Sequence, residues 1–412
     1  MHRPRIRFAK LDARRLYLIF NAAASLCYTL VFTASSLFVI TEARLEPLQL
    51  VLVGTVLEFS TFIFEIPTGV VADLVSRRLS IIIGFFLLGA GFIIYGSWTY
   101  FATILLAQVI WGLGYTFTSG ASEAWISDEI GEERSAVTFL AAARLDQLTS
   151  LVAIPLTVVL ADWGGLSLPM LLGGSGFILL AVFLWLVMPE DGFTPTAAEE
   201  RTSWQRMRQT LQQGLGMIRT RPALLGILGI GLFYGLYSEA YDRLSTALLL
   251  ERFIFPTWLD LPLIGWFGAI SAVGMLFSLA AIAFVEKQRW TQPRQVTLAM
   301  GGGTTLLVAA LLGFALSHNL AFSISLIWTI GLLRRVNAPL YTAWVNHRLD
   351  SQVRATVISM SSQVDALGQI AGGPLLGLAA QLAGLQAGLL GSAVLLCPAL
   401  LLFALQLRGE AR

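Results

Sequence analysis

The sequence predicts an all-α integral membrane protein with twelve transmembrane helices in two pseudo-symmetric six-helix bundles, and three observations predict this fold class. First, 56% of the 412 residues are hydrophobic and 13% are charged, whereas soluble proteins are about 25% charged. Second, the apolar runs are unbroken, as in residues 81–95, and a transmembrane barrel would alternate in polarity over segments of about ten residues. Third, twelve helices of roughly 20 residues fit this length comfortably.

Polar or Gly-containing loops separate the apolar runs and so define the elements in order. The first run follows a basic segment and continues to residue 40, which is too long for a signal-peptide core, so we expect it to be retained. The expected helices lie near residues 15–40, 48–72, 80–98, 101–126, 137–161, 166–188, 223–250, 261–285, 296–316, 319–345, 356–382 and 385–407.

Lys and Arg gather on one side of this layout. The termini and the loops that share their side carry 21 of these residues, and the opposite loops carry two, Arg44 and Arg252. Because basic loops stay in the cytoplasm, we expect both termini there.

A polar stretch divides the chain into a bundle at 1–188, a linker at 189–222 and a bundle at 223–412. Five apolar residues in the linker follow a helical spacing, which predicts an amphipathic helix on the membrane surface, with a solvated tether as the alternative. The halves also repeat at an offset of 219, which indicates two parallel bundles around a midplane site. The matching residues are Gly112, Trp125, Asp146 and Pro155 with Gly331, Trp344, Asp365 and Pro374.

Several classes of function have little support in the composition. The three histidines are far apart and the two cysteines lie in apolar runs, so we expect no metal site, no disulfide and no hydrolase triad. The net charge of +2 does not indicate nucleic-acid binding. No ATPase motif is present, and we expect no cofactor and no enzymatic activity.

The loop after the second expected helix carries the clearest motif, with Gly69, Asp73, Arg77 and Arg78 in the order Gly-Val-Val-Ala-Asp-Leu-Val-Ser-Arg-Arg. This pattern resembles the major facilitator superfamily, and the resemblance covers essentially the whole chain. It implies that these four residues form a gate on the cytoplasmic side.

Three further segments look like the bacterial drug-efflux branch of that superfamily, which includes macrolide and tetracycline exporters. They are Glu65-Ile-Pro67-Thr68, Ser122-Glu123-Ala-Trp125 and Ser238-Glu239-Ala-Tyr-Asp242-Arg243. The resemblance implies a monomeric, proton-coupled antiporter in the bacterial inner membrane, although Gln108 stands where the family has a proton-linked arginine.

Charged residues inside the expected helices are the main functional signal. Each would cost roughly 2.5–3.5 kcal/mol if unpaired at the bilayer centre, so they must face a cavity or each other. Acids exceed arginines by three, which favours proton coupling or cationic substrates. The residues are Glu58, Glu65, Glu123, Asp146, Glu239, Asp242 and Asp365 with Arg144, Arg243, Arg334 and Arg335.

Four of these acids have no arginine nearby in the sequence and are the candidates for proton coupling: Glu65, Glu58, Asp242 and Asp365. Glu65 ranks first, because it shares a helical face with Glu58 and lies beside Pro67 in a stretch that we expect to be buried. The alternative is that these glutamates bond to a neighbouring helix.

The other charges have expected partners. Glu239 and Arg243 are four residues apart and predict a structural ion pair, which would leave Asp242 as the freer acid. Glu123, Arg144 and Asp146 are expected at similar depth, as an ion-pair cluster beside the gate.

One face of the tenth expected helix combines a cation, an amide and two aromatic rings. These are Arg334, Asn337, Tyr341 and Trp344, and Asn21 and Tyr241 complete the expected substrate cavity. Such a face suits an amphipathic organic molecule; the alternative is that Arg334 pairs with an acid of the other bundle and that the rings only pack.

The sequence therefore predicts a secondary transporter that exports small amphipathic or drug-like molecules in exchange for protons. Two alternatives remain open: a proton-coupled importer of a metabolite or lipid-like compound, and a membrane enzyme or non-transporting scaffold on a transporter fold.

Overall fold

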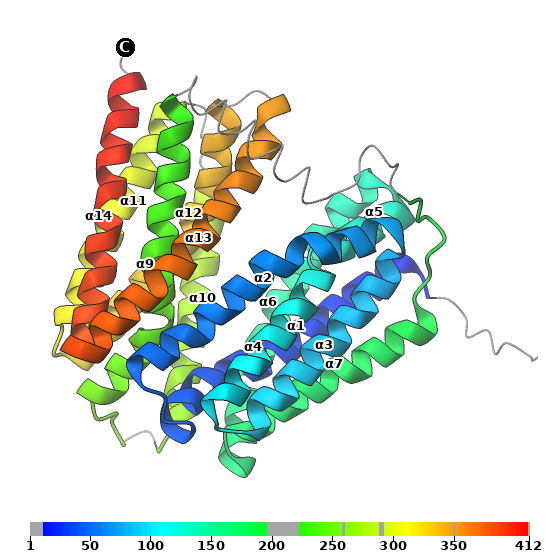
Figure 1. Cartoon of the computed structure of the whole chain (residues 1–412), viewed down its shortest axis with the longest axis horizontal. Helices are drawn as coiled ribbons and strands as arrows, with labels where there is room; N and C mark the ends of the chain where they lie inside the picture. The colour runs from blue at the N-terminus through cyan, green and yellow to red at the C-terminus, as the bar shows by residue number, and fades with distance from the viewer. Residues whose placement is uncertain (1–10, 196–221, 258–259, 288–291, 349–350, 411–412) are drawn as a thin grey trace, which may run out of the picture. The chain divides into compact units, whose positions relative to one another are not determined.

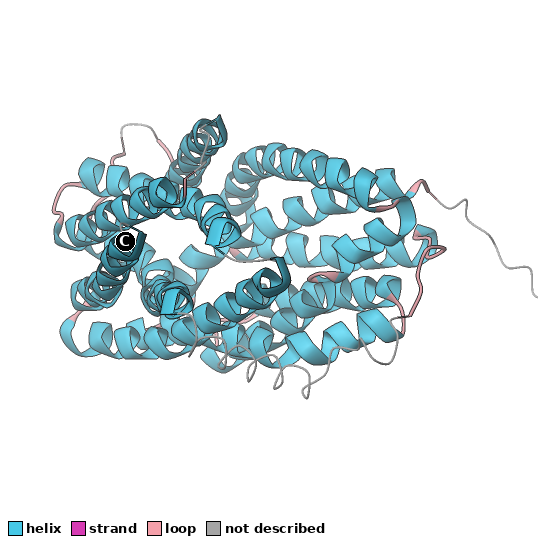
Figure 2. Cartoon of the chain, turned by 90° about the horizontal axis from the view of Figure 1, so that it is seen from above, coloured by secondary structure: helices cyan, strands magenta, loops and turns pink. Residues whose placement is uncertain are grey.

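The computed structural model describes residues 11–195, 222–257, 260–287, 292–348 and 351–410. All regular elements in these ranges are helices (Figures 1 and 2). The expected amphipathic helix of the linker falls almost entirely on residues 196–221, outside the described residues.

The first half of the chain contains α1 (Ala13–Leu37), a π-helical turn η1 (Phe38–Glu42), α2 (Pro47–Leu74), α3 (Arg77–Ser97), α4 (Phe101–Thr118), α5 (Ala121–Ile130), α6 (Glu132–Gly164) and α7 (Ser167–Val187). The second half contains α9 (Pro222–Arg252), α10 (Leu263–Lys287), α11 (Pro293–Leu316), α12 (Leu320–Arg348), α13 (Ser351–Ala383) and α14 (Leu385–Glu410). Eleven segments of the described chain are long and apolar enough to cross a membrane. Together with α12, which carries Arg334 and Arg335, they match the twelve expected helices and confirm the predicted fold class.

The chain divides into two compact units, and the boundary between them falls within α2. Unit 1 comprises Met1–Ala43 and Ser60–Arg206, and unit 2 comprises Arg44–Phe59 and Met207–Arg412. The first part of α2 therefore packs with the C-terminal helices, and Glu58 and Glu65 of the same helix belong to different units.

Glycines allow close helix contacts within each unit. In unit 1, a Cβ atom built on Gly89 of α3 would lie 2.6 Å from the carbonyl oxygen of Gly174 in α7, and the reverse distance is 2.9 Å. In unit 2, Gly368 and Gly372 of α13 lie against the backbone of α9 near Leu236. Small residues at these crossings let the backbones approach, which is the usual basis of helix packing in membranes.

One expected span contains a break. The span expected over residues 101–126 corresponds to Phe101–Ile130 in the structure, but within it α4 ends at Thr118 and α5 begins at Ala121. Gly120 lies between them with φ of +72°, a left-handed conformation that glycine adopts without steric cost. This break changes the direction of the chain just before Glu123, so the helical register of α4 does not continue to that residue.

Candidate functional site

Unit 2 contains a cavity of about 570 Å³ between α9, α12 and α13. Polar and aromatic side chains from all three helices line it: Tyr234, Tyr237, Ser238, Arg334, Asn337, Tyr341, Ser361, Ser362, Asp365 and Gln369. A volume of this size matches the clefts that hold drug-sized ligands.

Arg334 of α12 pairs with Asp242 of α9 beside this cavity. Two parallel hydrogen bonds join the groups, one of them 2.8 Å long between Nη2 and Oδ2. The guanidinium also lies 6.0 Å from the ring centre of Tyr237 and 5.8 Å from that of Tyr241. The expectation that Asp242 is the freer acid is therefore wrong, because its partner comes from a helix that is distant in sequence.

Asp365 of α13 lies in the cavity wall and has a neutral partner. Its Oδ2 atom accepts a hydrogen bond of 2.8 Å from Nε2 of Gln369, one turn further along the same helix. Within the described ranges, no Lys, Arg or His side chain forms an ion pair with it. The carboxylate thus contributes a negative charge to the cavity that no direct ion pair compensates.

The other residues expected in the substrate cavity take different positions. Asn337 and Tyr341 line it, and Tyr341 donates a hydrogen bond to Ser361. Trp344 is fully buried and donates to Thr297 Oγ1 at 2.8 Å, so it packs behind the wall.

Asn21 does not belong to this cavity. It lies on α1 of unit 1, where its Nδ2 atom donates to the backbone oxygen of Tyr17 at 2.8 Å.

A second group of charges lies where the first part of α2 meets α9 and α13; we call it the Gly54 junction, formed by Gly54, Glu239, Arg243 and Gly373. The expected pair is present, with Arg243 Nε donating to Glu239 Oε1 at 2.8 Å. A Cβ atom on Gly54 would overlap that carboxylate, and one on Gly373 would lie 2.8 Å from Thr55 Oγ1. A side chain at position 54 would therefore displace the ion pair, and one at position 373 would crowd Thr55.

Glu58 lies one turn beyond Gly54 and is half-buried. Its carboxylate is within electrostatic range of Glu239, Arg243, Asp242 and Asp365. The junction and the cavity therefore form one electrostatic neighbourhood with four acids and two arginines, Arg243 and Arg334.

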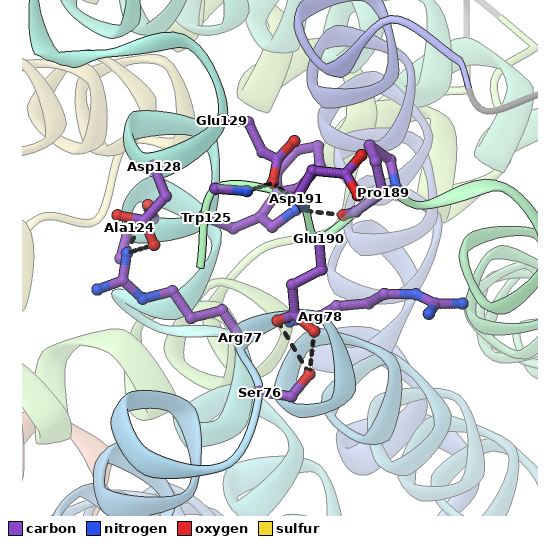
Figure 3. Close-up of polar contacts among 11 residues, drawn as sticks. Ser76, Arg77, Arg78, Ala124, Trp125, Asp128, Glu129, Pro189, Glu190 and Asp191 are labelled. Atoms are coloured by element: carbon purple, nitrogen blue, oxygen red, sulfur yellow. Dashed lines mark hydrogen bonds and ion pairs between the residues drawn. The ribbon is translucent and has the colours of Figure 1, made fainter. Parts of the chain in front are cut away.

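Unit 1 carries a cluster of polar contacts around the turn between α2 and α3 (Figure 3). Arg77 bonds the carboxylate of Asp128 and the backbone oxygen of Ala124, the latter at 2.7 Å. Glu190 accepts from the backbone N–H of Arg78 at 2.9 Å and from the hydroxyl of Ser76 at 2.7 Å. An acid from beyond α7 thus binds the first turn of α3.

The residues after α7 are held in place by α5 as well (Figure 3). Trp125 Nε1 donates to the backbone oxygen of Pro189 at 2.8 Å, and Glu129 accepts from the backbone N–H groups of Asp191 and Gly192 at 2.7 and 2.8 Å. We call Pro189–Gly192 the linker start. Sequence reasoning missed Asp128, Glu129 and Glu190; the acidic end of α5 was the available signal.

The remaining residues of the expected gate lie on α2, α5 and α6. Asp73 is half-buried in the last turn of α2, and a Cβ atom on Gly69 would meet nothing within 4 Å. No ion pair joins Glu123, Arg144 and Asp146 in the described structure, where the first two are exposed. The expected ion pairs among them are therefore not formed in the described structure, and the role of these residues beside the gate stays a prediction.

Glu65 differs from expectation in its surroundings. Its side chain is exposed, although the sequence predicted burial beside Pro67. The hydroxyl of Thr68 donates to the backbone oxygens of Phe64 and Glu65 around the proline, so a side chain satisfies the backbone there. The expected burial is wrong, and the role of Glu65 in proton coupling stays a prediction.

The helical bundles and the polar cavity within the membrane-spanning region define the class of protein, a polytopic transport protein. The sequence pattern of the Major Facilitator Superfamily matches residues 17–373, and the chain belongs to this superfamily. It is therefore a membrane transporter of the Major Facilitator Superfamily type.

Individual proteins are similar to the chain in sequence or in fold. The chain is 24% identical over 369 residues, 87% of each chain, to YxaM of Bacillus subtilis (strain 168), an uncharacterized MFS-type transporter. Its fold is similar to that of the nucleoside transporter NupG, with a TM-score of 0.73 at 12% identity over 96% of this chain and 99% of the other. It is also similar to a bacterial homologue of the human lysosomal transporter Spinster, with a TM-score of 0.73 at 15% identity over 97% and 98%.

Proposed function

We propose that the chain is a secondary active transporter that moves small amphipathic organic molecules by alternating access, coupled to protons. The cavity in unit 2 is the observation that carries this proposal. Tyr234, Tyr237 and Tyr341 offer flat contact area, and Asn337 and Asp365 offer polar groups that fix orientation.

The charges around the cavity support proton coupling. Glu58, Glu239, Asp242 and Asp365 outnumber Arg243 and Arg334 in unit 2. An excess of acids over arginines in a membrane favours the binding of a proton or a cation. Asp365 and Glu58 are the leading coupling candidates: Asp365 lies in the cavity wall with a neutral partner, and Glu58 lies within electrostatic range of the other three acids. Glu65, whose side chain is exposed, remains a third candidate.

We further propose export as the direction, a monomer as the working form, and a bacterial inner membrane with both termini in the cytoplasm. The motifs shared with drug exporters support the direction, and the asymmetry of Lys and Arg supports the orientation. Import of a metabolite is the competing direction.

Transport by purified protein in liposomes tests this proposal. A chemically diverse panel of amphipathic compounds is assayed with an imposed pH gradient of either sign. For protein in its cellular orientation, acid outside should drive export of at least one compound. Acid-driven uptake would establish the importer instead, and transport that ignores the gradient would contradict proton coupling.

Replacement of the two glutamates of α2 locates the coupling group. Glu58→Gln should abolish gradient-driven accumulation while leaving passive exchange, because glutamine mimics the protonated acid. Glu65→Gln is the matched variant seven residues away on the same helix. If only Glu65→Gln uncouples transport, the coupling site lies outside the group of Glu58, Glu239, Asp242 and Asp365.

A further inference from the structure

We propose that Asp365 is the recognition group for a positively charged nitrogen, so that the transported molecules are organic amines with an apolar or aromatic body. This inference rests on the proposed function and names the substrate class of the same cavity. It follows from the distribution of charge among three side chains in the wall: Arg334, Asp365 and Gln369.

The arginine in the cavity is already neutralised. Both terminal nitrogens of Arg334 donate to the two carboxylate oxygens of Asp242, and two tyrosine rings lie near the guanidinium at 5.8 and 6.0 Å. A substrate anion would have to displace Asp242 from this bidentate pair or bring a further negative charge beside it. The site is therefore poorly suited to carboxylates and phosphates.

The acid in the cavity keeps unused capacity. An ionised carboxylate offers about four acceptor positions on two oxygens, and the hydrogen bond to Asp365 comes from the amide of Gln369 at 2.8 Å. A positively charged nitrogen supplies the missing charge, and a protonated amine adds N–H donors as well. The carboxylate and the ammonium would relieve each other's cost of burial.

The neighbouring side chains fit the remainder of such a molecule. Ser361, Ser362, Asp365 and Gln369 lie within about two turns of α13 and form a polar strip on the cavity wall. The ring of Tyr341 stands beside this strip, held by its hydroxyl on Ser361. Tyrosine rings attract cations and also cover apolar surface, so the cavity can hold both parts of an amphipathic amine.

A set of three probes with one shared body separates charge from shape. Each probe carries an anthracene ring on a propyl chain that ends in trimethylammonium, hydroxyl or carboxylate. Binding to the purified full chain in detergent is followed by energy transfer from tryptophan. We expect the trimethylammonium probe to bind about tenfold tighter than the alcohol, a difference of ~1.4 kcal/mol, and the carboxylate to bind most weakly. Equal affinity of cation and alcohol, or preference for the carboxylate, would overturn the inference.

Two variants assign the preference to Asp365. Asp365→Asn should remove the tenfold advantage of the cation and leave the affinity for the alcohol nearly unchanged. Glu46→Gln is the control, because it removes one acid that binds Gln381 at 2.8 Å outside the cavity. Retention of the cation preference in Asp365→Asn would overturn the assignment.

If Asp365→Asn no longer binds the alcohol probe, the cation preference is tested with Gln369→Lys instead. This change places a cation one turn from Asp365 and should also abolish the preference for the trimethylammonium probe; persistence of the preference would contradict the inference. These binding results are separable from coupling, since a protein that prefers the cation but ignores a pH gradient in liposomes contradicts the proposed function alone.

Discussion

Arg334 and Asp242 show how strongly single residues depend on each other in this cavity. Removing one partner leaves the charge of the other uncompensated within a membrane-spanning helix, whereas removing both leaves no such charge. We expect Asp242→Asn and Arg334→Gln each to lower the melting temperature of the purified protein, and the double variant to lower it less than the sum. Coupling of about 0.5–3 kcal/mol is typical of contacting residues, and partial exposure of this pair places it toward the lower end. Additive losses would contradict the pairing.

Two glycines of α2 offer a matched test of the Gly54 junction. Gly54→Ala would push the Glu239 carboxylate off Arg243, whereas Gly69→Ala would meet nothing within 4 Å. Alanine favours a helix over glycine by about 0.5–1 kcal/mol, so Gly69→Ala should be neutral or stabilising in thermal unfolding. Gly54→Ala should be destabilising despite the same gain. Equal effects of both changes would show that the ion pair tolerates the methyl group.

At the scale of elements, the first turn of α3 is held by its N-cap residue, Ser76, and by Glu190 of the linker start. Ser76 is the N-cap residue, and its oxygen accepts from the N–H of Leu79 at 2.9 Å while its hydroxyl donates to Glu190. Ser76→Ala should lower the free energy of unfolding by about 0.5–2 kcal/mol, the usual loss for a helix cap.

Glu190→Ala should speed hydrogen exchange in the first turn of α3, as measured by mass spectrometry. Glu133→Gln, an exposed change in the first turn of α6, serves as the control, and equal exchange in both variants would argue against the contact.

The helices themselves were largely predictable, and the contacts between them were not. Hydropathy alone placed the spans, because each must bury about 20 apolar residues in lipid. The i, i+4 pair of Glu239 and Arg243 was predictable because helix geometry fixes that spacing. The partner of Asp242 was not, since Arg334 lies 92 residues away and one sequence does not reveal which helices meet.

For the whole molecule, the charge asymmetry predicts orientation in the membrane. Reporter fusions after Arg78, Glu200 and Arg412 should all report the cytoplasm, because the basic segments share one side. A fusion after Arg44, in an opposite loop, is the control and should report the other side. A cytoplasmic signal there, or an external signal from any of the three, would contradict the twelve-helix layout.

The central claim is that the cavity in unit 2 binds the transported molecule, and protection of a single cysteine from labelling tests it most directly. Cys27 and Cys397 are replaced by alanine, and Ser362→Cys adds a thiol at the exposed position in the cavity wall. Thr257→Cys, exposed in a loop outside the cavity, is the matched control. A transported compound should slow maleimide labelling at position 362 in proportion to its occupancy and leave position 257 unchanged. Equal labelling at position 362 with and without a saturating transported compound would contradict the account.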